Sequence, residues 1–202
     1  MDEPVYSRRR FAGLAASALI LQLLEIAPAL AATPESYIKG IGANVLALAN
    51  GPSRGKALRA KFANLLSQYV NLRNIAGSAL GVYRPKLPAS DKEKFNTLVT
   101  TYAAALFVYY VDKFQGTDIA IDNVVESGSY TIVKSHIVKA GLGGEQVTWF
   151  LSKSGGGYQV VDLSILGVRL SVAMRDAFGR ELKKSKGDFN ALYDFLAEAE
   201  TW

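Results

Sequence analysis

Few side chains in this sequence could do chemistry, and Asp162 is the strongest candidate among them. It lies within the apolar run 158–165, shortly before Gly167. A lone strand carboxylate in an apolar pocket can act as a general base. However, no second titratable group is placed to pair with it or to tune it. Because Arg169 and Arg175 follow downstream, we expect Asp162 to have a structural role at a turn or in an ion pair.

The other candidates for catalysis or metal binding are weaker. His136 is the single histidine, and no carboxylates lie beside it at ligand spacing. Asp118 and Asp122 share a strand face but have no predicted partner in register. Gly155 to Gly157 lie between two strands, which favours a hairpin turn over a phosphate loop. We expect no enzyme activity, no metal and no cofactor.

The sequence contains no cysteine. This excludes a disulfide framework, a thiolate nucleophile, a cysteine metal site and a lipid-attachment cysteine. The core must therefore hold together through packing and hydrogen bonds alone.

The N-terminal segment has the pattern of an export signal. Arg8 to Arg10 precede Phe11, an Ala-rich apolar stretch runs to Leu24, and small residues follow at 29–31. This order is typical of a signal peptide, and the arginines resemble the twin-arginine motif, with an ordinary Sec signal as the alternative. We expect residues 1–31 to be removed on export and residues 32–202 to form one domain in the periplasm.

The charge balance suits an anionic partner or lipid head groups. Export would remove three of the 23 basic and three of the 18 acidic residues, leaving 20 − 15 = +5. That excess is too small to indicate nucleic-acid binding by itself.

The pattern of apolar residues predicts the elements that position these groups. Apolar positions recur at helical spacing over 34–80, broken at 50–53, and again from about 90 to 114, where 102–111 is apolar almost all round. Four strand-like runs separated by glycine turns follow at about 117–126, 129–139, 145–154 and 157–165, and then two helices at about 168–186 and 188–200. This order predicts an α+β fold with a curved four-stranded antiparallel sheet packed against a cluster of helices and enclosing an apolar pocket.

The surplus of apolar residues in the later strands and in 102–111 suggests that the pocket holds a hydrophobic ligand. Two alternatives remain: a packed interaction module without a cavity, and a cone-shaped α+β enzyme that uses Asp162 or His136. The candidate pocket residues are apolar positions of the long helix, the strands and the first turn of the next helix: Leu98, Tyr102, Leu106, Tyr109, Trp149, Leu151, Val161, Leu163, Val168 and Val172.

Four stretches, in order along the chain, resemble the MlaC or toluene-tolerance family of periplasmic phospholipid-binding proteins. They are Tyr69–Gly81, with its Asn-Leu and Ile-Ala pairs; Phe95–Tyr109, with Tyr102 followed by three alanines; Tyr158–Leu170, with Val-Val-Asp and Gly-Val; and Arg175–Phe178. The chain has Asn71, Leu166 and Arg169 where that family has Asp, Glu and Ser.

The resemblance implies a carrier that binds phospholipid acyl chains and moves lipid between an inner-membrane ABC transporter complex and an outer-membrane lipoprotein complex. Such carriers maintain outer-membrane lipid asymmetry. A related branch of the family would carry a hopanoid instead. The resemblance also implies that Asp162 is an architectural residue and that the protein is not an enzyme.

Overall fold

The computed structural model describes residues 33–201, except for the side chains at positions 142 and 143. The predicted export signal therefore lies outside the described residues. Six α-helices and five strands follow one another within the described part of the chain, in an α+β order: α1 (Pro34–Asn50), α2 (Gly55–Tyr69), α3 (Leu72–Ala79), α4 (Lys92–Tyr109), β1 (Asp118–Ser127), β2 (Tyr130–Lys139), β3 (Leu142–Ser154), β4 (Gly157–Ile165), β5 (Val168–Arg169), α5 (Leu170–Lys184) and α6 (Phe189–Glu198). Short 3-10 turns include Gly81–Lys86, Ala89–Asp91 and Val111–Phe114.

Polar side chains fix the starts of three helices. The side chain of Thr33 accepts a hydrogen bond from the backbone N–H of Ser36 at the start of α1, and Asn71 and Asp188 do the same at α3 and α6. Residues Ser90–Glu93 have the sequence pattern of a capping box. The box does not form, because residues 89–91 make a 3-10 turn and the Ser90 hydroxyl donates to Asp91 instead.

The strands form one antiparallel sheet in the order β1-β2-β3-β4-β5. The expectation of four strands is wrong by one: β5 adds a two-residue strand where a helix was predicted to begin at 168, and α5 starts at Leu170. The turn between β4 and β5 contains only Leu166 and Gly167, both with positive φ. A two-residue hairpin with positive φ at both positions reverses the chain while keeping the twist of the strands.

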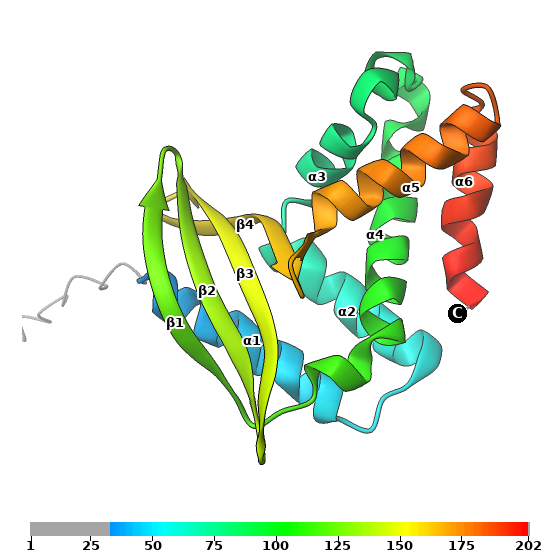
Figure 1. The fold of residues 1–202 in the computed structure, drawn as a ribbon. Helices are drawn as coiled ribbons and strands as arrows, with labels where there is room; N and C mark the ends of the chain where they lie inside the picture. The colour runs from blue at the N-terminus through cyan, green and yellow to red at the C-terminus, as the bar shows by residue number, and fades with distance from the viewer. Residues whose placement is uncertain (1–32, 202) are drawn as a thin grey trace, which may run out of the picture. The chain divides into compact units, whose positions relative to one another are not determined.

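Helices cover one face of the sheet, and a second helical layer lies beyond them. Figure 1 shows α1 running along the sheet and α4 between α2 and α6, while α5 runs from the end of the sheet past α3 to α6. α4 is therefore buried on two sides along its middle, as its all-round apolar sequence predicts. The expectation fails at the C-terminal end of α4, where Tyr109 and Tyr110 are exposed and the helix gives way to the 3-10 turn 111–114.

Candidate functional site: an apolar cavity under the sheet

The inner face of the sheet is built by strict alternation along the central strands. In β3, Val147, Trp149 and Leu151 point toward the helices, and the register places Trp149 beside Val133 of β2 and Leu163 of β4. Because side chains alternate with a period of two, one choice of register decides the whole inner surface. This surface is the sheet side of the core.

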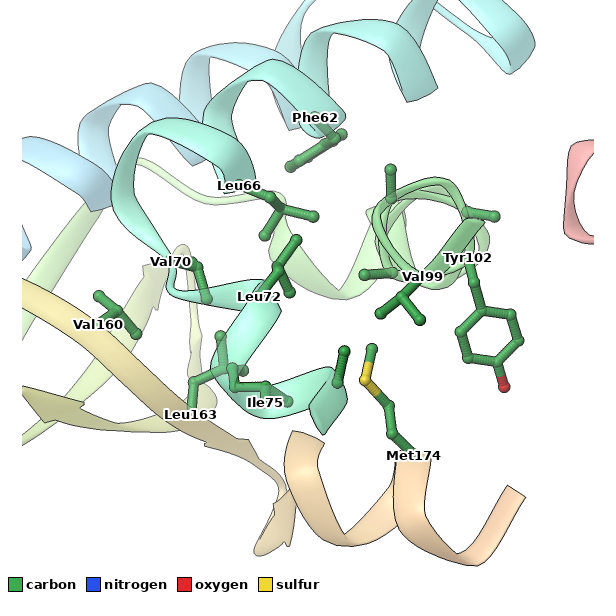
Figure 2. Close-up of a cluster of buried hydrophobic side chains, with 14 of the residues drawn as sticks. Phe62, Leu66, Val70, Leu72, Ile75, Val99, Tyr102, Val160, Leu163 and Met174 are labelled. Carbon is green, nitrogen blue, oxygen red and sulfur yellow. The ribbon is translucent and has the colours of Figure 1, made fainter. Parts of the chain in front are cut away.

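A small enclosed cavity lies between this surface and helices α1, α2 and α4. Its volume is about 30 Å³, which is room for one or two water molecules. Every lining residue is apolar: Ile41, Gly42, Val45, Phe62, Leu65, Leu66, Val70, Phe107, Phe114, Ile119, Ile137, Val147, Trp149, Leu163 and Ile165. Figure 2 shows part of this region, with Phe62 and Leu66 of α2 and Leu163 of β4 directed into the core between the helices and the sheet.

The single polar atom that Trp149 brings to the cavity wall is satisfied within the sheet. Its indole N–H donates to the Ser135 hydroxyl at 2.9 Å, and that hydroxyl donates to the carbonyl of Val147 at 3.2 Å. Both side chains are buried, so the hydrogen bonds avoid the cost of an unpaired polar group. The cavity therefore presents only carbon surface to whatever enters it.

The helix side of the cavity depends on aromatic packing and on one glycine. Phe107 of α4 stacks on Phe62 of α2, with ring centroids 5.6 Å apart, and contacts Phe114 at 5.3 Å. Gly42 lets α1 approach β1, because a Cβ at that position would lie 2.3 Å from Ile119. Substitution of Gly42 by alanine would thus push the helix away from the strand.

The structure brings together only two of the predicted pocket residues at this cavity, Trp149 and Leu163. Leu151 is fully buried on the same face of the sheet, and Leu98 and Leu106 are half-buried against the core. Tyr102 packs on Phe178 and Phe195, on the side of α4 that Figure 2 shows turned away from Phe62.

The remaining predicted positions lie outside the cavity. Tyr109 and Val168 are largely exposed, and Val172 is half-buried near the start of α5. Val161 lies on the other side of the sheet, in a groove beside Asp162 and Arg169. A register shift between Phe150 and Leu151 causes this change of face.

Sequence reasoning missed most of the helix side of the cavity, above all Phe107 and the α2 residues. Phe107 lies on the opposite side of α4 from Tyr102, and both sides are apolar. The helical period of α2 was visible in the sequence, but it gave no sign that this face, rather than another, borders the sheet.

A second group of buried polar side chains, besides Trp149 and Ser135, is centred on Asp162 at the bend from β4 to α5. One of its carboxylate oxygens accepts the backbone N–H of Leu163 at 2.9 Å and that of Ser171 at 3.2 Å. The other accepts the Ser171 hydroxyl at 2.6 Å and the Nε–H of Arg169 at 2.8 Å, and it forms an ion pair with Nη2 of the same guanidinium at 2.8 Å. Asp162 thus caps the start of α5, and Arg169 stacks on Phe150 at 4.1 Å from the ring centroid.

This geometry agrees with the structural role expected for Asp162. Its side chain is 4% exposed, and both carboxylate oxygens are occupied by donors from the bend itself. A general base needs a lone pair directed at a substrate proton. Here the hydrogen bonds fix a strand to a helix instead.

His136 does have an acidic partner, contrary to the expectation from sequence. Its Nδ1 lies 2.6 Å from Asp122 Oδ1 on the outer face of the sheet. Asp122 reaches it because the pairing of β1 with β2 shifts by one residue between Ile121 and Asn123. Both side chains are more than one-third exposed, and no cluster of potential metal ligands occurs among the described residues.

These features define a class: an α+β protein with a wholly apolar cavity between a curved sheet and helices, and a buried carboxylate whose hydrogen bonds join the sheet to a helix. The MlaC protein family model matches residues 44–198, which is most of the chain, so the chain belongs to the MlaC family. A search of curated proteins finds no match.

Several solved structures share the fold. One is a phospholipid-binding protein from Ralstonia solanacearum, solved in complex with a phospholipid. It is 18% identical, with a TM-score of 0.66, and the alignment covers 81% of this chain and 94% of that one. None of the helices in the described part of the chain is both long and apolar enough to cross a membrane.

Proposed function

We propose that this protein is a periplasmic lipid carrier that holds the acyl chains of a phospholipid between its sheet and its helices. The observation that carries the proposal is the wholly apolar lining of the cavity, with the one nearby polar side-chain atom tied back into the sheet. Membership of the MlaC family and the fold shared with a phospholipid-binding protein support it.

The physical need for such a carrier is large. A buried methylene is worth about 0.8 kcal/mol, so two long acyl chains cost on the order of 20 kcal/mol to expose to water. A free lipid therefore crosses an aqueous space at a negligible rate. A protein site as dry as the bilayer interior removes this cost and allows exchange in both directions. Direction must then come from partners, for which we propose an inner-membrane ABC transporter complex and an outer-membrane lipoprotein complex.

The cavity must enlarge to hold a lipid. Ligand sites for molecules of drug size and above occupy about 300–1,000 Å³, ten times or more the 30 Å³ enclosed here. Separation of the sheet from α1, α2 and α4 would supply that volume. Most of the packing that this separation breaks is apolar and non-directional, and the acyl chains would replace it. The exception is the end of α2, where the backbone N–H of Asn71 donates to the carbonyl of Val160 in β4 at 2.9 Å. Within the described residues, the chain passes between the sheet and the helices at only two places, residues 115–117 and the junction of β5 with α5.

Trp149 provides the test, because it lines the cavity and is one of only two tryptophans. In a Trp202→Phe background, addition of phosphatidylglycerol or phosphatidylethanolamine to delipidated protein should shift the Trp149 emission and saturate at one lipid per protein. The same titration on Trp202→Phe with Phe107→Glu should give no saturable change, because a charge would lie where the chains pack. A saturable response to a hopanoid alone would reassign the ligand, and no response to any lipid would reject the carrier.

A further inference from the structure

The wall of the cavity reaches the protein surface at two of its lining residues. Phe107 and Ile165 are half-buried, whereas all the other lining residues are buried. Phe107 lies near the C-terminal end of α4, and Ile165 is the last residue of β4. An opening of the cavity would therefore form first between the end of α4 and the β4–β5 turn.

Exposed apolar side chains follow both Phe107 and Ile165 in the chain. Tyr109 and Tyr110 follow Phe107 on α4 and are 70% and 51% exposed, and their rings contact edge to face at 4.9 Å. Leu166 and Val168 follow Ile165 and are 60% and 58% exposed. Four of the seven large apolar residues exposed in the described chain thus belong to these two short segments. We call Tyr109, Tyr110, Leu166 and Val168 the apolar rim.

One rim residue is held in an unfavourable backbone conformation. Leu166 has φ of +52°, in the left-handed region that bulky side chains rarely occupy. A two-residue turn of this kind favours Asn or Gly at its first position. Leucine here is costly twice, because it strains the backbone and exposes apolar surface to water. A cost of this kind points to a function outside the isolated fold.

We propose that the apolar rim inserts into the interface of a lipid bilayer and so opens the cavity directly toward the membrane. Tyrosine together with aliphatic side chains is the composition of membrane-interface anchors, since one end of the tyrosine ring is apolar and the other is polar. One cation lies beside the 3-10 turn that follows α4, because Lys139 Nζ donates to the carbonyl of Lys113 at 2.9 Å. Its charge suits the phosphates of lipid head groups, although Asp112 lies next to Lys113 in the chain.

The occupant that these features favour is the bilayer rather than a protein. Lipid that leaves the cavity at Phe107 and Ile165 would pass between the rim residues, and with the rim inserted it would not contact water. The purpose of the rim thus rests on the proposed carrier role, but binding to vesicles is measured separately from lipid content.

The test is vesicle flotation of the purified protein with two matched variants. Leu166→Asn removes the leucine and suits the positive φ, so its melting temperature should be unchanged or raised. Its partitioning onto phosphatidylethanolamine–phosphatidylglycerol vesicles should fall about tenfold relative to the wild type. Val82→Asn removes the most exposed large apolar side chain of the described residues, at 83%, but one outside the rim. That control should bind vesicles as the wild type does.

A second measurement reports the depth of insertion. In a background with Trp149→Phe and Trp202→Phe, the fluorescence emission of Tyr110→Trp should shift to the blue when vesicles are added. Brominated acyl chains in the vesicles should quench that emission. Tyr130→Trp, at an exposed site at the start of β2 and outside the rim, should show neither the blue shift nor the quenching.

The outcomes separate the two proposals. The rim is rejected if the wild type does not float with vesicles, if Val82→Asn loses as much binding as Leu166→Asn, or if floating requires an added membrane protein. In each case, lipid bound to the purified protein would still support the proposed carrier function. Conversely, vesicle binding by a protein that never holds lipid would support the rim and reject the carrier.

Discussion

The cavity under the sheet and the bend at Asp162 are held together by opposite kinds of interaction. The cavity wall is made of carbon surface from three helices and four strands, with no polar partner directed into it. At the bend, one carboxylate accepts four hydrogen bonds from three residues, one of which also forms an ion pair with it. Apolar contacts can be exchanged for acyl chains at little net cost, whereas directional hydrogen bonds keep one geometry. The comparison suggests which part of the fold adapts and which part holds the sheet to the helices.

The largest expected effect is at the bend. Asp162→Ala should lower the free energy of unfolding by about 2–3 kcal/mol, because Ser171 and Arg169 lose a buried, charged acceptor. Asp162→Asn should cost roughly 1–3 kcal/mol and retain lipid binding. Urea denaturation measures both. A melting temperature unchanged in Asp162→Asn, together with the loss of some turnover, would make Asp162 a catalytic base.

The next effect separates the cavity from the packed helical core. Val147→Trp fills the cavity, so we expect a loss of at most about 1 kcal/mol of stability and a clear loss of bound lipid. Val99→Trp overpacks the fully buried side of α4 near Met174 and should cost about 2 kcal/mol. Thermal melts and lipid content per protein are the two readouts. Equal destabilisation by both changes would show that the region under the sheet is packed as tightly as the helical core.

A smaller effect is expected at the polar pair behind the cavity wall. Ser135→Ala leaves the buried Trp149 N–H without its acceptor and should cost about 1–2 kcal/mol. Ser135→Thr keeps a hydroxyl and serves as the control, although its extra methyl group must be accommodated. A neutral Ser135→Ala would contradict this account, because the indole N–H would then lie buried without its acceptor at no cost in stability.

The smallest effect is expected on the outer face of the sheet. Asp122→Asn breaks a carboxylate pair with His136, as Asp162→Asn does with Arg169, but both partners are partly exposed. Exposed pairs contribute little, so we expect less than about 0.5 kcal/mol at pH 7. A loss of stability as large as that of Asp162→Asn would show that burial does not determine how much each carboxylate contributes.

Most of the fold could be predicted from sequence periodicity, but the site could not. The strands were placed to within about three residues because glycine turns separate them. The helix α4 illustrates the limit: apolar on both sides, it gave no reason to prefer Phe107, which borders the cavity, over Tyr102, which packs against α5 and α6. The periodicity of a helix shows which positions are buried, but not against which element.

Register shifts explain the errors in the sheet. The bulge at Phe150–Leu151 moves Val161 away from the cavity, and the shift after Ile121 brings Asp122 to His136. A bulge depends on pairing between strands, which a single strand sequence does not record. The short strand β5 was missed for a similar reason, since two residues cannot show an alternation.

The most direct test of the carrier is mass spectrometry of an organic extract of the protein purified from its native envelope. The account predicts a glycerophospholipid, present near one molecule per protein in the wild type and depleted in Val147→Trp. A wild-type protein that is repeatedly free of lipid, and that takes up none from vesicles, would contradict it.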